Sequence, residues 1–348
     1  MRPRHRKYFL RNAASAAAGL AVLAIVAAST QSPADASGNG YRIGSALSIK
    51  KKPSPTPTGT TTSPSPTPTP APTGPCGGAT PLKADGSAWV CTFDDEFDGT
   101  TLDRSKWFVQ TTAATGFHSG AECFVDSGNN LAVSGGTLSL TVRKERAPFT
   151  CTSPTGSYTT QYTSGTVNGY GKFAQTYGMF EVRAKLPSTT AKGLQETLWL
   201  WPVNSLKYGL WPGSGEIDFA EFYSQYQGWN IPYIHYHPAT SADWSTDTNV
   251  YTAWPYPYSQ PGMSCAFDPS LFNDYTVVWE PGRITLQVNH KSCVVDNYAA
   301  SGLTAPAPFD QPFFIALTQA LGVGTNAFVD GTTPLPATTQ IDYVRIWK

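Results

Sequence analysis

Short runs in which hydrophobic and polar residues alternate recur along the chain after residue 75. Residues 137–142, 179–186 and 285–288 alternate with the period of a half-buried strand. Residues 313–317 form a continuous apolar run that fits a central strand covered on both faces. Long amphipathic helix patterns are absent from the sequence. Many short strands separated by frequent turn residues predict an all-β domain, either a sandwich or a jelly roll.

The first 36 residues have the pattern of a secretory signal peptide. Basic residues within positions 2–11 precede an apolar, uncharged segment at residues 13–28, and Ala34-Asp35-Ala36 has the form of a cleavage site. The apolar segment is short for a membrane span, which needs about 20 residues. We therefore expect a secreted, extracellular protein, with stable membrane insertion only if the signal is retained.

The rest of the chain divides into a linker and one large domain. Residues 37–75 are expected to be irregular and then extended, because residues 53–75 alternate Pro with Ser and Thr and contain too little apolar surface to bury. We interpret this segment as a plain tether. Residues 76–348 are long enough for a single β domain and contain all ten Trp residues.

The neutral charge of the whole chain conceals an acidic domain. Nine of the 24 basic side chains and one of the 24 acidic ones lie in residues 1–75, which leaves residues 76–348 with 15 basic and 23 acidic side chains, a net charge of −8. Such a charge argues against nucleic acid and other anionic polymers as partners. A neutral polysaccharide suits it better.

All six cysteines fall in the predicted domain. An even number of cysteines in an exported protein indicates disulfides, and fifteen pairings of six are available. We expect the sequential pairing Cys76–Cys91, Cys123–Cys151 and Cys265–Cys293. No CxxC pair occurs, so the sequence gives no indication of a zinc site.

Glu216, Asp218 and Glu221 place three carboxylates in a strand-like run of otherwise apolar residues. Side chains of a strand alternate between faces, so Glu216 and Asp218 share one face and Glu221 falls on the other. We predict a β-bulge near Phe219-Ala220 that returns Glu221 to the first face. A solvated strand face and a calcium site are the alternatives, but buried acids without partners are costly and calcium takes more oxygen ligands. Paired carboxylates are the groups that hydrolyse glycosides.

The run Glu216-Ile217-Asp218-Phe219-Ala220-Glu221 resembles the E-I-D-x-x-E signature of glycoside hydrolase family 16 in its bulged, laminarinase-like form. Further segments that resemble the family lie at residues 93–97, 177–187, 208–212, 275–279 and 341–346. The resemblance implies a β-jelly-roll sandwich of two curved antiparallel sheets with a concave substrate cleft. It also implies Glu216 as nucleophile, Asp218 as assisting acid and Glu221 as acid/base.

The function implied by the resemblance is that of a secreted, endo-acting hydrolase of β-glucans, with β-1,3-glucan as the first choice of substrate. The mechanism would be a retaining double displacement without a catalytic cofactor. Mixed-linkage glucanase, galactanase and transglycosylase activities in the same fold are alternatives, and a non-catalytic glucan-binding module is a rival of another class. The expected partner is a neutral polysaccharide and the expected state a monomer.

Five further residues are predicted to bind sugar: Trp199, Trp211, His235, Asn130 and Gln319. Structural alternatives exist for several of them, because tryptophan and histidine are often core residues and asparagine is a common turn residue.

Neighbouring residues leave parts of this prediction open. Trp201 shares strand parity with Trp199, and His237 shares it with His235. We expect His235 to lie near Glu221. Before Trp199 the family often has W-P-A, where this chain has Gln195-Glu196-Thr197, and Glu196 is a candidate for an additional ligand.

A structural calcium ion is the one metal that the resemblance implies. Glu96, Gly136 and Asp342 match its ligand positions, on the side of the sandwich away from the substrate. Oxygen donors suit calcium, although three protein ligands would need water to complete the shell. Such an ion would stabilise the sandwich and would take no part in catalysis.

Overall fold

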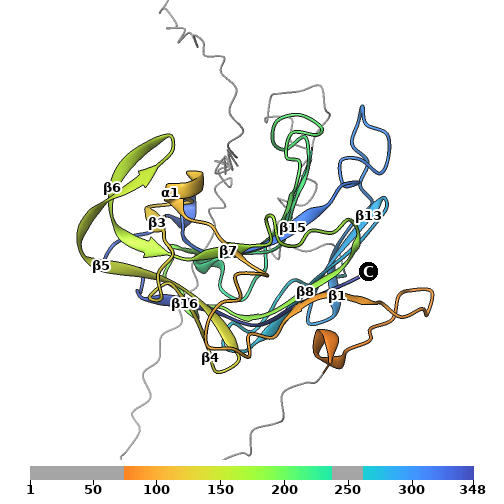
Figure 1. Cartoon of the computed structure of the whole chain (residues 1–348), viewed down its shortest axis with the longest axis horizontal. Helices are drawn as coiled ribbons and strands as arrows, with labels where there is room; N and C mark the ends of the chain where they lie inside the picture. The colour runs from red at the N-terminus through yellow and green to blue at the C-terminus, as the bar shows by residue number, and fades with distance from the viewer. Residues whose placement is uncertain (1–73, 237–261) are drawn as a thin grey trace, which may run out of the picture.

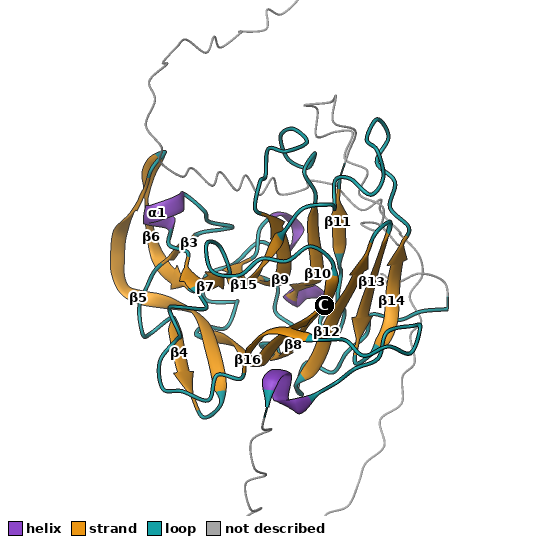
Figure 2. Ribbon diagram, turned by 45° about the vertical axis from the view of Figure 1, so that its right-hand side comes forward, coloured by secondary structure: helices purple, strands orange, loops and turns teal. Residues whose placement is uncertain are grey.

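Two β-sheets packed face to face form the domain in the computed structural model, which describes residues 74–236 and 262–348 (Figures 1 and 2). The strands of the larger sheet, in spatial order, are β14 (Lys291–Asp296), β13 (Arg283–Val288), β12 (Asn273–Glu280), β8 (Gly178–Lys185), β16 (Ala337–Trp347), β5 (Thr137–Ser153), β6 (Gly156–Ser164) and β3 (Glu122–Phe124). Two more strands join it, β1 (Cys91–Asp95) against β16 and β4 (Leu131–Ser134) against β5.

The smaller sheet carries the strand with the three acids. Its spatial order is β11 (Tyr233–His235), β10 (Glu216–Tyr223), β9 (Leu194–Pro202), β15 (Phe313–Leu321), β7 (Thr166–Asn168) and β2 (Phe108–Val109). Within residues 74–236 and 262–348, helical structure is limited to short pieces, namely α1 (Thr112–Thr115), η1 (Pro75–Gly78), η2 (Ser224–Tyr226) and η4 (Gly324–Asn326). None of the helices in the described ranges is long and apolar enough to cross a membrane.

The all-β prediction is confirmed, and so are its individual strands. The alternating runs 137–142 and 285–288 fall within β5 and β13, and the run 179–186 nearly coincides with β8. All the paired strands are antiparallel except β3 and β6, which run parallel. The apolar run that begins at Phe313 lies in β15, whose nine residues are all buried. A continuous apolar run was thus a sound indicator of a central strand.

The main hydrophobic core fills the space between the two sheets. From the smaller sheet, Leu198, Leu200 and Ile217 point inward, and from the larger sheet Phe180 and Val182 meet them. Burying a side chain of this size contributes about 1.5–3 kcal/mol. Because alternate residues of a strand face opposite ways, the inward direction of Leu198 and Leu200 sends Trp199 and Trp201 to the outer face of the smaller sheet.

A polar network crosses this core and corrects two predictions. The side chain of Gln319 is fully buried between the sheets, where its Nε2 donates to Glu196 Oε1 (2.7 Å) and its Oε1 accepts from Thr339 Oγ1 of β16 (2.8 Å). Glu196 and Gln319 are cross-strand partners on β9 and β15, so both take the same inward direction. Gln319 therefore does not reach the outer face, and Glu196 is no additional ligand there.

The three disulfides join the cysteines in the expected sequential pairs. Cys76–Cys91 ties η1 to β1, Cys123–Cys151 ties β3 to β5, and Cys265–Cys293 ties the segment that precedes β12 to β14. Each closes a loop whose entropy in the unfolded chain makes the bond worth roughly 3 kcal/mol.

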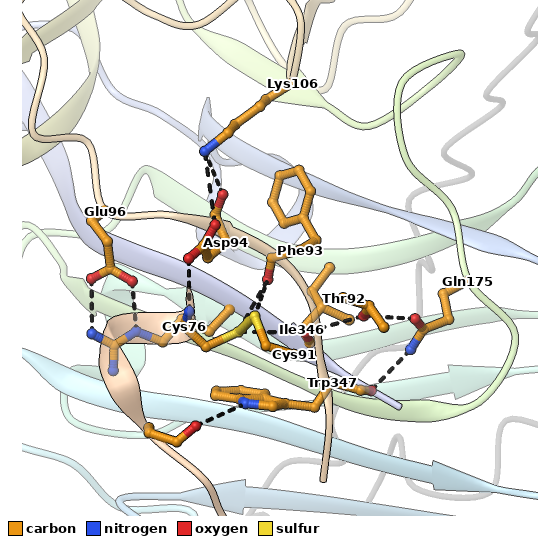
Figure 3. The surroundings of a disulfide bond; sticks show 12 residues. Cys76, Cys91, Thr92, Phe93, Asp94, Glu96, Lys106, Gln175, Ile346 and Trp347 are labelled. Carbon is orange, nitrogen blue, oxygen red and sulfur yellow. Dashed lines mark hydrogen bonds and ion pairs between the residues drawn. A yellow bond between two sulfur atoms is a disulfide. The ribbon is translucent and has the colours of Figure 1, made fainter. Parts of the chain in front are cut away.

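The first of these disulfides fastens the segment around η1 to β1 (Figure 3). The backbone nitrogen of Cys76 donates to Asp94 Oδ2 (2.7 Å), and Trp347 at the end of β16 donates from Nε1 to the carbonyl of Ala79 (3.4 Å). These contacts hold the segment around η1 against β1 and β16.

Arginine side chains form ion pairs with the two acids that were predicted to bind calcium. Both carboxylate oxygens of Glu96 accept from Arg345, from Nε and Nη2 at 2.8 Å each. The Nε of Arg183 lies 3.1 Å from Asp342 Oδ2. A calcium ion bound by these carboxylates would have to displace two cations, so the arrangement does not fit the predicted site.

The buried Glu196 yields a stability prediction. Burial raises its pKa from 4.5 to about 8, against the lowering effect of the hydrogen bond from Gln319. Because the folded pKa lies above the unfolded one, its contribution to stability is full below pH 4.5 and is lost as the pH rises toward 8. Glu196→Gln should therefore stabilise the protein by on the order of 3 kcal/mol at pH 7 and by almost nothing at pH 4.

Urea unfolding of the variant and of wild type at both pH values measures this difference. Glu280→Gln, at an exposed position of β12, is the matched control and should leave the free energy of unfolding unchanged at both pH values. A variant no more stable than wild type at pH 7 would mean that Glu196 is ionised in the folded protein.

Candidate active site

The pairing of β10 with β9 contains the predicted bulge. Asp218 pairs with Trp199 and Ala220 with Leu198, so Phe219 is the extra residue on β10. Phe219 and Ala220 both lie in the hydrophobic core. Glu221, the next residue, therefore returns to the face of Glu216 and Asp218, opposite the core. We call this outer side of the smaller sheet the acidic face.

Each acid of the triplet has its own polar partner on the acidic face. Trp211 donates from Nε1 to Glu216 Oε2 (2.6 Å), and Gln195 donates from Nε2 to Glu221 Oε1 (2.7 Å). His235 Nε2 lies 3.3 Å from Asp218 Oδ2. These partners come from β9, from β11 and from the loop before β10, so three separate segments define the geometry of one strand.

Burial and mutual repulsion shift the proton affinity of the two glutamates. Burial, and then the negative charge of Asp218, raise the pKa of Glu216, while His235 and the Trp211 N–H oppose the rise. Burial and Asp218 likewise raise the pKa of Glu221, to about 8, against the opposing effects of Tyr223, His235 and Gln195. Three neighbouring carboxylates cannot all ionise cheaply, so the triplet retains a proton at neutral pH.

His235 lies beside Glu216, which corrects the expected placement near Glu221. In the pairing of β11 with β10, His235 is directly opposite Glu216 and Tyr233 is opposite Asp218. The imidazole stacks on the ring of Tyr233 (5.5 Å between centroids) and lies 5.2 Å from the ring of Trp211. His237, the alternative to His235, lies outside the described residues.

The loop that carries Trp211 is anchored at both ends. Tyr208 donates from its hydroxyl to Asp310 (2.8 and 2.7 Å to the two oxygens), and Lys207 forms an ion pair with the same carboxylate (2.9 Å). Gly215 precedes the strand with a φ of 83°, and a Cβ at this position would lie 2.6 Å from the Phe309 ring. Only glycine allows both this φ and this close contact, and the chain continues from it directly into Glu216.

Trp199 and Trp201 face the acidic side but are largely covered. Each is 5% exposed and belongs to an aromatic cluster with Phe117 and Phe314. The Trp199 ring stacks on Phe117 (6.1 Å), and its Nε1 donates to Thr318 Oγ1 (3.1 Å). The packing therefore assigns Trp199 a supporting role beneath other aromatic rings and does not present it as a free platform for a sugar.

Asn130 lies in the turn just before β4 of the larger sheet, whereas the acid-bearing strand β10 is in the smaller sheet. The side-chain nitrogen of Asn130 donates to the carbonyl of Thr141 (2.8 Å) and to Thr163 Oγ1 (3.1 Å), and the residue is 1% exposed. These bonds join β4, β5 and β6 at the start of the β4 strand. The structural alternative of a turn asparagine accounts for this position.

Divalent metal ligation has one candidate set in the active-site region. Ligand atoms of Glu216, Asp218 and His235 lie within 4.8 Å of one another. The same three side chains also make the contacts described above, Glu216 with Trp211 and Asp218 with His235. These contacts already bring the groups close together.

Two residues around Glu221 were missed as site residues. Gln195 and Tyr223 are cross-strand partners beside Glu221, and the hydroxyl of Tyr223 favours the ionised form of that acid. The signal for Gln195 was present in the sequence, because it precedes Trp199 by four residues and so shares its strand face. Tyr223 follows Glu221 by two residues and shares its face by the same argument.

Comparison with known proteins identifies relatives of this arrangement. The family model described as glycosyl hydrolases family 16 matches residues 117–344. The glucan endo-1,3-beta-glucosidase A1 of Niallia circulans is 34% identical over 273 residues, which cover 74% of this chain and 37% of that protein. The keratan-sulfate endo-1,4-beta-galactosidase of Sphingobacterium multivorum is 33% identical over 187 residues, 54% of this chain and 40% of that protein.

A solved structure supports the same relationship. The catalytic domain of an endo-1,3-beta-glucanase (laminarinase) from Thermotoga petrophila superposes with a TM-score of 0.58 at 27% identity, over 75% of this chain and 98% of that one. The two curated relatives are much longer than their matching parts, since this chain spans 37% and 40% of their lengths.

The electrostatics of the acidic face predict that Glu221 is protonated at neutral pH. With its pKa raised to about 8, its carboxyl should titrate near pH 8 in a ¹³C NMR titration of glutamate-labelled protein. The resonance should be missing from Glu221→Gln, whereas Glu196→Gln removes the signal of Glu196, another buried glutamate whose pKa is raised to about 8. A Glu221 midpoint below pH 5.5 would contradict this description of the triplet.

Proposed function

The chain belongs to glycosyl hydrolases family 16, and we propose that it is an endo-acting hydrolase of β-1,3-glucan that retains the configuration of the anomeric carbon. The observation that carries the proposal is the bulge at Phe219, which places Glu221 on the face of Glu216 and Asp218. Without it, an acid and a nucleophile on one strand would point to opposite sides of the sheet.

The proposed reaction uses Glu216 as nucleophile and Glu221 as acid and base. Glu221 gives its proton to the glycosidic oxygen while a Glu216 oxygen attacks the anomeric carbon, so that the leaving sugar departs as an alcohol. Glu221, now ionised, takes a proton from water, whose oxygen attacks the same carbon and releases Glu216. Asp218 supports both steps, because its charge raises the proton affinity of Glu221 and it holds His235 beside Glu216.

Charge and homology support β-1,3-glucan as the substrate. The domain carries a net charge of −8, which suits a neutral glycan better than an anionic one. The Niallia and Thermotoga relatives are named for activity on β-1,3-glucan. The basic and apolar N-terminal pattern supports export from the cell, and we propose a monomer that acts outside it.

Activity on a β-galactan is the second candidate. It is favoured by the 33% identity to a keratan-sulfate endo-1,4-beta-galactosidase, almost equal to that of the glucanase relative. Digestion of laminarin, lichenan, agarose and keratan sulfate with analysis of the products separates the two. Release of short oligosaccharides from laminarin supports the proposal, products longer than the donor indicate transglycosylation, and binding without any release of reducing sugar indicates a glucan-binding module.

Loss of the nucleophile should abolish hydrolysis without unfolding the protein. Glu216→Gln keeps the shape of the side chain but removes the attacking oxygen anion, so turnover of laminarin should fall on the order of 10⁴-fold or more. Glu280→Gln is the control and should retain wild-type activity. Hydrolysis by Glu216→Gln at a rate near that of wild type, with an unchanged melting temperature, would refute the role assigned to Glu216.

The hydrogen bond from Trp211 should set the acid limb of the pH profile. Its N–H favours the ionised form of Glu216, so Trp211→Phe should raise the pKa of Glu216 further and move the acid limb of kcat/KM to higher pH. Loss of a hydrogen bond to a charged group should also lower kcat/KM about tenfold to hundredfold. Trp89→Phe, in the segment before β1, is the control, and an unshifted acid limb in Trp211→Phe would exclude this influence on Glu216.

A further inference from the structure

Gln195 is in direct polar contact with the proposed acid/base. It lies on the acidic face of β9, opposite Tyr223, and donates from Nε2 to Glu221 Oε1 (2.7 Å). The residue is 8% exposed, so its amide is held away from bulk water. A buried amide with a fixed neighbour has few alternative partners, and its orientation is coupled to that neighbour.

The other end of the same amide has no partner. In the described part of the chain, four buried side-chain atoms lack a hydrogen bond, and Gln195 Oε1 is the one that lies beside an acid of the triplet. Two of the others, on Tyr275 and Trp279, belong to the interior core. A buried carbonyl oxygen without a donor is unfavourable, so a position that retains one requires an explanation.

The two protonation states of Glu221 supply that explanation. An ionised carboxylate only accepts hydrogen bonds, whereas a protonated carboxyl also donates one through its O–H. A glutamine amide has a donor end and an acceptor end of nearly equal shape, and a half-turn about its last torsion exchanges them. Nε2 therefore suits the ionised form and also a protonated carboxyl whose O–H points elsewhere, whereas Oε1, which is unpaired in the observed orientation, suits a carboxyl whose O–H points at Gln195.

We propose that Gln195 is a positioning residue that holds Glu221 in both of its protonation states, by turning its amide over when Glu221 directs its proton at the substrate. This inference rests on the proposed function of Glu221. Before the reaction begins, Oε1 of Gln195 accepts from the O–H of protonated Glu221. When that O–H turns to the glycosidic oxygen, the amide turns over and Nε2 donates to the other oxygen of the carboxyl group. After the proton has left, Nε2 donates to the carboxylate, which then takes a proton from water. The amide itself gains and loses no proton.

Other groups around Glu221 act on its charge but are differently placed. Asp218 and Glu216 on the same strand repel its negative charge, and His235 on β11 attracts it. The hydroxyl of Tyr223, whose pKa is raised well above 10 by burial, stays protonated and contributes a second hydrogen bond. Among these neighbours, Gln195 is the side chain that combines a contact to Glu221 with an unused acceptor.

Gln195→Met tests the proposal, because methionine matches the length of glutamine but has neither amide end. Loss of the N–H that favours the ionised carboxylate should raise the pKa of Glu221 and move the basic limb of kcat/KM to higher pH. On laminarin, kcat/KM should fall about tenfold to hundredfold. On a dinitrophenyl glycoside, whose leaving group needs no proton, kcat/KM should fall by less than about threefold.

Gln195→Glu and Gln340→Met complete the experiment. Gln195→Glu keeps the shape of glutamine, and at low pH its neutral carboxyl can donate or accept a hydrogen bond. This variant should therefore be active at low pH. Above neutral pH it should lose activity, because two neighbouring carboxylates repel each other. Gln340→Met makes the same change on β16 of the other sheet. It should leave kcat/KM on both substrates, and the basic limb of its pH profile, as in wild type.

Equal losses on both substrates with an unmoved basic limb would overturn the role of Gln195 and leave the proposed function intact. If wild type cleaves no glycan of the panel, the proposed function fails separately. The ¹³C NMR titration of Glu221 in Gln195→Met still decides on Gln195 in that case. A higher midpoint than in wild type supports the positioning role, and an unchanged midpoint rejects it.

Discussion

The structure depends on one geometric constraint, that two carboxylates five positions apart on a strand must face the same way. Regular alternation forbids this, and the bulge at Phe219 permits it. The extra residue is accommodated because Phe219 and Ala220 can both be buried, one as a large ring and the other as a single methyl group in the same core. The hydrophobic core therefore fixes the bulge, and the bulge fixes the chemistry on the opposite face.

Much of this arrangement could be predicted from local sequence. The three acids, the apolar residues between them and the alternation of a strand were enough to predict a bulge near Phe219-Ala220. The strands of the sandwich followed from periodicity, and the sequential disulfides join the cysteines that were expected to pair. These features depend on residues that are neighbours along the chain or, for the disulfides, on cysteines that follow one another in the sequence.

The errors arose where a side chain's direction depends on a distant partner. The run that begins at Phe313 is apolar throughout, so it contains no alternation from which the direction of Gln319 could be deduced, and pairing with Glu196 sets it. Trp199 does lie on the predicted face, but Phe117, from a segment about 80 residues earlier, covers its ring. The contacts of Arg345 with Glu96 and of Arg183 with Asp342 likewise join segments that are far apart in the sequence. No local sequence pattern predicts such ion pairs.

The partners of the two glutamates explain how one strand can present an acid and a nucleophile. Burial and Asp218 raise the pKa of both, so their common environment alone would not separate their roles. The indole N–H of Trp211 can only donate, which favours one charge state of Glu216, the anion that a nucleophile needs. The amide of Gln195 can donate or accept, which suits a group that must be protonated in one step and ionised in the next. The difference between a partner that only donates and a partner that donates or accepts thus supports the two proposed roles, and it comes from β9 and the loop before β10, outside the acidic strand itself.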